Sequence, residues 1–309
     1  MADFRIAEVT AAEPTAADLG LGPPGKPRSM ARRAWEVFAE NKLALAGLAF
    51  LVFIVLFCFV GPLFYHTNQV NTDLSNYLCK PSPEHLLGCN ELGYDQLGRL
   101  MIGGQTSLEV GIAAAIVAVA FGALYGAIAG FVGGPLDSVL MRIVDAGLSL
   151  PFIMVLIILS VIYHPNPATM VFIIAAFYWF GPARLVRGET LSLRTREYVQ
   201  AVRVLGGSQM RSVTRHILPN SIGVIIVQGT FAVADAILIL SGLGVLGLGV
   251  TPPATDWGSM LSGGLNYIQG GGYWWLIYPP GLCIILTCIS FNFIGDALRD
   301  AFENRLQRR

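Results

Sequence analysis

The stretch from Leu43 to Tyr65 reads LALAGLAFLVFIVLFCFVGPLFY, 23 residues without a charged side chain. A helix needs about 20 mostly apolar residues to cross a bilayer, so this stretch is long enough to span one. The composition agrees, because 54% of the 309 residues are hydrophobic, 13% are charged and the mean hydropathy is +0.61. Such values argue against a soluble globular or disordered protein, and a net charge of +0 argues against a nucleic-acid-binding protein. We therefore predict an all-α integral membrane protein.

Further uncharged stretches extend this prediction to six membrane spans. Between Asp145 and Arg184 the chain has 38 consecutive uncharged residues, which is too long for one helix. The segment His164-Pro-Asn-Pro167 within it predicts a tight turn between two short spans. The six predicted spans cover about 43–65, 108–132, 148–163, 170–186, 222–248 and 273–295.

The distribution of basic residues predicts the orientation of these spans. Segments on one side of the predicted membrane hold 18 of the 20 Lys and Arg residues, and basic residues favour the cytoplasmic side. Both termini are therefore expected to be cytoplasmic. The predicted parts are a cytoplasmic tail with an interfacial helix (1–42) and a transmembrane domain (43–309), which contains an outer loop (66–107) and a cytoplasmic loop (187–220).

Two cysteines lie in the predicted outer loop. Cys79 and Cys89 are ten positions apart in a compartment where disulfides persist, so we predict a disulfide between them; the alternative is two free thiols. A metal site would need more ligands, and His66 and His85 are the only histidines nearby. No metal is expected.

The sequence offers little support for catalysis. Gly20-Leu-Gly-Pro-Pro-Gly-Lys-Pro27 fits a phosphate-binding loop until Pro27, which stands where Ser or Thr would bind magnesium. No apolar strand precedes this segment, so we interpret it as a linker. No His-Glu-x-x-His or Gly-x-Ser-x-Gly motif occurs. An integral-membrane enzyme is therefore disfavoured, and no catalytic residue or bound cofactor is predicted in this chain.

Asp235 is the one acid deep inside a predicted span. A lone Asp in a span is costly to insert and usually lines a cavity or pairs with polar groups. Ion-coupled secondary transporters generally need such a group, so Asp235 keeps that alternative function open. Against it, the other predicted spans offer no obvious partner acid.

The cytoplasmic loop carries more than a positive charge. Glu197 to Leu205 is predicted to form a short amphipathic helix, Gly206-Gly207 breaks it, and Ser208 caps a second helix that runs toward Ile217. A compact pair of helices that projects from the membrane suits docking into a groove on a partner protein, because rigid helices transmit a push.

This loop resembles the coupling loop of ATP-binding-cassette importer permeases. That family has a Glu-Ala-Ala helix start, then a glycine and a Leu-Pro close at fixed spacing. Here Gly206, Leu218-Pro219 and Ala201 fit the pattern. Gln200 stands where the Glu would be and Val202 where the second Ala would be, although Glu197 lies one turn earlier.

Other segments resemble the dipeptide and oligopeptide branch of these permeases, from about Leu43 onward. Leu87 to Asp95 is similar to the branch's Leu-Gly-Thr-Asp-Glu-Leu-Gly-Arg-Asp signature, with Cys89 and Tyr94 as departures. Leu240 stands where the branch commonly has Glu. The remaining landmarks are Arg142–Asp145, Leu150-Pro151, Ala183–Arg187, Pro252-Pro253, Trp257–Leu261, Phe291-Asn292 and Gly295-Asp296.

The resemblance implies a type I importer permease fold with six transmembrane helices and a cytoplasmic coupling helix. It implies a multi-pass protein of the bacterial cytoplasmic (inner) membrane that pairs with a second, homologous permease. One or two ATPase subunits would bind ATP and Mg below, and a substrate-binding protein would deliver peptides above. The implied ATPase-coupling residues are Glu197, Gln200, Ala201, Gly206, Gly207, Ser208, Arg211, Leu218 and Pro219, and the pathway or gate candidates are Asp235, Asp256 and Trp257.

Overall fold

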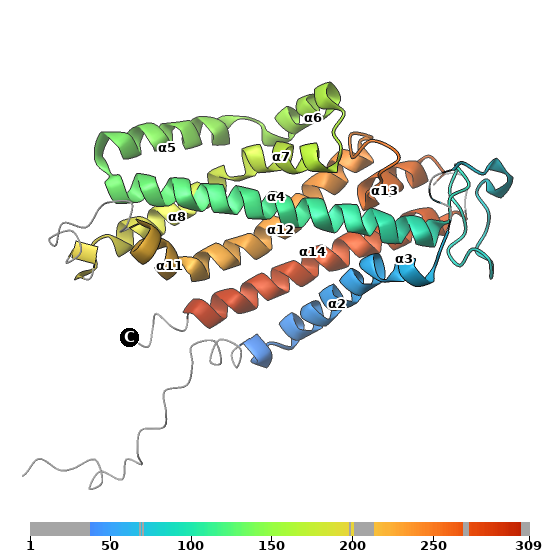
Figure 1. The fold of residues 1–309 in the computed structure, drawn as a ribbon, viewed down its shortest axis with the longest axis horizontal. Helices are drawn as coiled ribbons and strands as arrows, with labels where there is room; N and C mark the ends of the chain where they lie inside the picture. The colour runs from blue at the N-terminus through green and yellow to red at the C-terminus, as the bar shows by residue number, and fades with distance from the viewer. Residues whose placement is uncertain are drawn as a thin grey trace, which may run out of the picture.

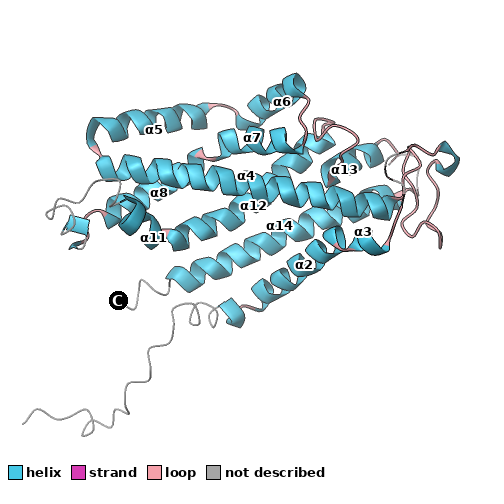
Figure 2. Cartoon of the chain, viewed as in Figure 1, coloured by secondary structure: helices cyan, strands magenta, loops and turns pink. Residues whose placement is uncertain are grey.

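The computed structural model describes residues 38–67, 69, 71–197, 199–200, 213–267 and 272–303. Within these residues the regular elements are helices, as Figure 2 shows. The expectation of an all-α protein is confirmed for this part of the chain. The helices, in chain order, are α2 (Lys42–Phe59), α3 (Gly61–Phe64), η1 (Leu74–Asn76), α4 (Gln96–Val132), α5 (Gly134–Ser149), α6 (Phe152–Tyr163), α7 (Pro167–Tyr178), α8 (Phe180–Leu193), η2 (Val213–Ile217), α11 (Leu218–Asn220), α12 (Ile222–Val245), α13 (Trp257–Leu265) and α14 (Trp274–Glu303).

The helices that can cross a membrane fall into two groups. Among the described residues, α2, α4, α12 and α14 are each long and apolar enough to span one. The pairs α5 with α6 and α7 with α8 pass the same test only together, and they are bent by 78° and 45°. Counting each bent pair as one crossing gives up to six spans.

Three boundaries differ from the sequence-based prediction. Helix α4 begins at Gln96, well inside the predicted outer loop 66–107, because the Asp95 side chain caps it by accepting the Gly98 N–H at 2.8 Å. Helix α5 occupies a segment that was excluded from the spans because it carries Asp137, Arg142 and Asp145. Helix α8 continues to Leu193, so the first part of the predicted loop 187–220 is helical.

Helix α4 is the central element of the fold. It packs against α8, α12, α7 and α2, while α14 packs against α12 and α2 (Figure 1). Small residues dominate its buried faces, with Ala115, Ala118 and Ala127 among them, which lets neighbouring backbones approach closely. The largest buried side chain, Trp257, belongs to the same core as α2 and α12.

The two ends of the bundle carry different parts of the chain. At the right end in Figure 1 lie α3, α13, the start of α4 and the loop before it. At the left end lie α11, the end of α8, the start of α2 and the end of α14. The two termini of the described helical core therefore approach the end that also carries the predicted coupling loop.

Candidate functional site

The predicted coupling loop (187–220) is anchored in the bundle on both sides of its centre. Val199 and Ile217 are fully buried, and Val213 is 2% exposed. These three side chains pack with Ala123, Ala127, Phe131 and Val186 of α4 and α8 in one apolar cluster. The segments that enter and leave the loop centre are therefore held on the end of the α4–α8 pair.

Several predicted coupling residues can be placed. Glu197 and Gln200 are exposed, and the Gln200 side-chain amide donates to the Thr195 carbonyl at 3.1 Å. Leu218 and exposed Pro219 begin the short helix α11. Ala201, Gly206, Gly207, Ser208 and Arg211 lie outside the described residues.

A glycine stripe on α4 forms the contact with α8. Gly122, Gly126 and Gly130 recur every four residues, so they share one face of the helix. A Cβ atom at Gly130 would lie 2.9 Å from the Arg187 carbonyl oxygen, and one at Gly126 would overlap the Ala183 carbonyl oxygen. The two backbones are thus in direct contact, which is how helices associate closely where lipid replaces water.

Basic residues of α8 secure the same end of the bundle. The Arg187 guanidinium donates to both carboxylate oxygens of buried Asp137 on α5, at 2.6 and 2.7 Å. Just after α8, Arg194 donates to the Gly130 carbonyl at 2.9 Å. Bidentate, charge-assisted bonds are among the strongest polar contacts, so α4, α5 and α8 are tied together next to the predicted coupling loop.

Asp235 is exposed and hydrogen-bonded. It is in the second half of α12, and the Tyr178 hydroxyl donates to its Oδ2 at 2.5 Å. Tyr178 is the last residue of α7, directly before the bend into α8. An Asp at the centre of a membrane helix costs about 2.5 to 3.5 kcal/mol on insertion scales, so an exposed one indicates a polar surrounding rather than lipid.

The other two pathway candidates, Asp256 and Trp257, are fully buried in this chain. Asp256 caps α13 by accepting the backbone N–H groups of Gly258 and Ser259 at 2.8 and 3.0 Å. The Trp257 indole donates to the Leu100 carbonyl of α4 at 3.0 Å. Trp257 thus holds α13 against the start of α4, while Asp256 fixes the first turn of α13, and a direct pathway or gating role for either residue stays a prediction.

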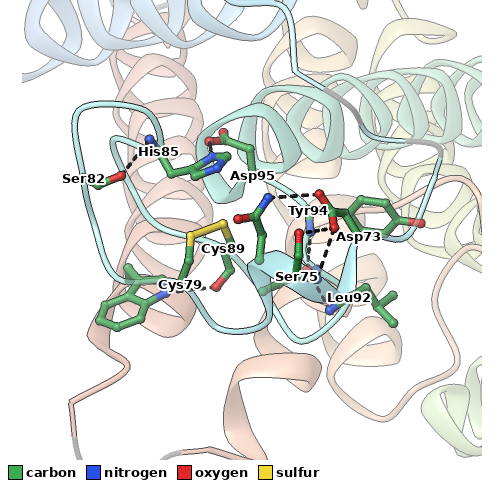
Figure 3. Close-up of a disulfide and its surroundings, with 12 residues drawn as sticks. Asp73, Ser75, Cys79, Ser82, His85, Cys89, Leu92, Tyr94 and Asp95 are labelled. Carbon is green, nitrogen blue, oxygen red and sulfur yellow. Dashed lines mark hydrogen bonds and ion pairs between the residues drawn. A yellow bond between two sulfur atoms is a disulfide. The ribbon is translucent and has the colours of Figure 1, made fainter.

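The segment before α4 (71–95, here the disulfide loop) is cross-linked. Cys79 and Cys89 form a disulfide with an S–S distance of 2.07 Å (Figure 3). The Trp275 indole of α14 donates to the Cys89 carbonyl at 3.2 Å. The loop is thereby joined to the end of the bundle.

Buried Asp95 links the disulfide loop to α4. Besides capping that helix, its carboxylate lies 2.9 Å from Nδ1 of His85 (Figure 3). The same carboxylate accepts the Tyr65 hydroxyl at 3.0 Å. His85 also lies close to both cysteines, but their sulfur atoms are bonded to each other. That leaves His85 as the remaining donor of the three, which does not make a metal site.

Exposed Asp73 organises the other side of the disulfide loop. Hydrogen bonds from the hydroxyl and the N–H of Ser75 hold the pKa of Asp73 below its usual range. The Asn76 side chain also donates to this carboxylate, at 3.0 Å. Asp73 is therefore expected to remain charged at neutral pH and to fix the turn η1.

Sequence reasoning missed three features of this site. The pairing of Asp137 with Arg187 joins residues 50 positions apart, and no local pattern signals it. The same holds for Tyr178 and Asp235. The glycine stripe was detectable, because repeated Gly-x-x-x-Gly spacing in an apolar helix indicates a close helix contact.

Comparisons with known proteins place the chain in a family. Residues 122–308 match the family described as binding-protein-dependent transport system inner membrane component, and residues 29–81 match the N-terminal TM domain of oligopeptide transport permease C. The dipeptide transport system permease protein DppC of Bacillus subtilis is 38% identical over 91% of this chain and 87% of its own length. The oligopeptide transport system permease protein OppC of Escherichia coli K12 is 40% identical over 89% of this chain and 91% of its own.

Proposed function

Because the chain belongs to the family of binding-protein-dependent transport system inner membrane components, we propose that it is a permease subunit of an ATP-driven importer for dipeptides or oligopeptides. Relatives that carry the dipeptide and oligopeptide names cover most of the chain, which supports the peptide class of substrate. The ion-coupled alternative for Asp235 is not supported, because the family is one of binding-protein-dependent transport.

The proposed mechanism depends on the anchored coupling loop. Separate ATPase subunits would bind ATP and Mg, and their closure would push on residues 197–220. Val199 and Ile217 are fully buried against α4 and α8, so a push on the loop would reach these helices directly. The permease would then alternate between outward-facing and inward-facing states while the ATPases hydrolyse ATP. This buried anchoring is the observation that carries the proposal.

The proposed partners follow from the same family. A second, homologous permease would complete the translocation pathway, and a substrate-binding protein would dock on the side of the disulfide loop. One or two kinds of ATPase would meet the coupling loop. Both termini would be cytoplasmic, in the inner membrane of a bacterium, which the distribution of basic residues supports.

Cross-linking in the purified complex tests this assignment. An Ala201→Cys or Ser208→Cys variant should be captured by a cysteine in the groove of the ATPase subunit. Leu74→Cys, exposed in the disulfide loop, is the matched control and should not be captured. The proposal fails if the coupling-loop cysteines never cross-link to a nucleotide hydrolase.

A functional test uses the same complex in liposomes. Replacing Gly206 with Trp should leave ATP hydrolysis running while peptide uptake falls, because the disturbed loop would no longer seat in the ATPase. Unchanged uptake in Gly206→Trp would contradict the assignment of residues 197–220 as the coupling loop.

A further inference from the structure

The exposed faces of two membrane helices differ in chemistry. On α2 the exposed side chains after Lys42 are apolar, with Val52, Phe53 and Leu56 each more than half exposed, as expected of a helix that faces lipid. On α12 the outward stripe includes exposed Asp235, Leu238 and Gly242. The α12 stripe thus presents a charge where α2 presents hydrocarbon.

This α12 stripe continues with further features that do not suit a lipid contact. Gln228, two turns before Asp235, is half-buried on the same side of the helix. A Cβ atom added at Gly242, two turns after Asp235, would meet no atom within 4 Å, so the stripe is open there. The polar groups of this stripe are the Gln228 amide and the Asp235 carboxylate, and polar groups within a membrane helix usually face a water-filled cavity or a polar partner.

No basic side chain among the described residues pairs with the Asp235 carboxylate. Tyr178 donates a neutral hydroxyl to Oδ2, and this bond orients the carboxylate from the bend between α7 and α8. Among the described residues, the ion pairs of the membrane helices join Arg184 to Asp145 and Arg187 to Asp137, and neither involves Asp235. A carboxylate held by one neutral donor can still attract a cation.

We propose that Asp235, oriented by Tyr178, is a cation-selecting site for the positively charged groups of peptides that pass through the importer. This inference rests on the proposed function, and it adds a charge preference located in the membrane subunit itself. The ligand is an ammonium or guanidinium group on the peptide, which the opposite charge of the Asp235 carboxylate attracts more strongly at a site enclosed by the membrane subunits than in bulk water. Acidic peptides would be disfavoured at the same point by like-charge repulsion.

The test measures peptide uptake by the complete importer in liposomes. Three tripeptides are compared: Ala-Lys-Ala, Ala-Ala-Ala and Ala-Glu-Ala. For each one, uptake by Asp235→Asn is divided by uptake by the wild type, so that the preference of the shared binding protein cancels. We expect this ratio to be about tenfold below one for Ala-Lys-Ala, closer to one for Ala-Ala-Ala, and highest for Ala-Glu-Ala.

Two control variants separate selectivity from structural damage. Tyr178→Phe keeps the carboxylate but removes the hydrogen bond that orients it, so its ratio for Ala-Lys-Ala should fall in the same direction as in Asp235→Asn and by less. If Tyr178→Phe instead lowers the uptake of all three peptides by one common factor, the two residues form only a structural contact and the proposal fails. Glu109→Gln removes the exposed acid of α4 and should change uptake of all three peptides alike. If the uptake ratios of Glu109→Gln depended on peptide charge as strongly as those of Asp235→Asn, the assignment of the site to Asp235 would be overturned.

The remaining outcomes also decide the matter. If the wild-type complex takes up all three peptides with ATP and Asp235→Asn lowers them by one common factor, the proposed function stands and the cation-selecting site is refuted. If the wild-type complex takes up none of them, the proposed function itself fails.

Discussion

Arg187 on α8 donates two parallel hydrogen bonds to Asp137 on α5, from Nε to Oδ1 at 2.6 Å and from Nη2 to Oδ2 at 2.7 Å. Asp137 lies in the first turn of α5, and Arg187 lies where α8 touches the glycine stripe of α4. One guanidinium thereby joins α5 to the pair of helices that carries the coupling loop.

Replacing Arg187 with Lys should lower the free energy of unfolding by about 1 to 2 kcal/mol, because an ammonium cannot make both bonds at once. Arg187→Met should cost about 3 kcal/mol or more, since it leaves a buried carboxylate unpaired. Denaturant unfolding of the purified subunit in detergent measures both effects. Arg184→Lys is the matched control, because the Arg184–Asp145 pair is more than half exposed and should be worth less than about 1 kcal/mol. Equal losses in both lysine variants would contradict this interpretation.

Gly126→Ala should destabilise the protein by about 2 to 3 kcal/mol, because the new methyl group would overlap the Ala183 carbonyl oxygen and push α8 away from α4. Gly188→Ala provides the comparison on α8 itself, where a Cβ atom meets nothing within 4 Å. That variant should be neutral or slightly more stable, by up to about 1 kcal/mol, because alanine favours the helix. Thermal unfolding of the two variants side by side measures the difference in stability. Similar melting temperatures would show that the close contact at Gly126 does not contribute to stability.

Ile217→Ala should weaken the attachment of the coupling loop. Ile217 is fully buried against α4 and α8, and truncating such a side chain costs about 2 to 5 kcal/mol. We expect fewer peptides imported per ATP hydrolysed in the reconstituted complex, because a loosened loop absorbs the push. Ile222→Ala removes the same atoms at a position that is 46% exposed, and should keep the wild-type ratio. If the two variants had the same ratio, the buried anchor would not be needed for coupling.

The disulfide should protect residues 71–95 from proteolysis. Without reductant, the denatured chain should show two cysteines fewer available to alkylation than after reduction, which intact mass measures directly. In the chain-entropy account, opening a loop of this size costs about 2 to 3 kcal/mol, so Cys79→Ser should make residues 71–95 more sensitive to protease. Cys283→Ser, which removes a free cysteine of α14, should leave the digestion pattern unchanged. Equal alkylation with and without reductant would refute the bridge.

The all-α fold class could be predicted from the sequence, but some helix boundaries could not. Arg99 and Glu109 interrupt the uncharged stretch, so hydropathy alone does not show that α4 begins before Val110. Asp95 was a usable signal there, because a capping Asp marks a helix start independently of hydropathy. Helix α5 escaped for a similar reason: the charge of Asp137 is compensated by Arg187, and pairing of that kind cannot be seen before the fold is known.

The residues of Glu197 to Pro219 predict a coupling loop by resemblance, and this assignment stays a prediction. The burial of Val199 and Ile217 could not be predicted, because it depends on how α4 and α8 pack. Asp235 stood out as a charge in an apolar helix, while its Tyr178 partner is 57 residues away. Asp256 and Trp257 were chosen as pathway candidates, and their burial became visible only when α13 was seen against α4.

Helix α4 has a mechanical consequence because of its length. Its 37 residues make an unbroken rod of about 55 Å, well beyond the roughly 30 Å of the hydrocarbon layer. One tip holds Asp95 of the cross-linked loop, and the other holds Gly130 beside Arg194. Because the helix is continuous, it would tilt as a rigid body, and a tilt imposed at one tip would move the opposite tip directly. Conformational changes at the two membrane faces would then be coupled through this one helix.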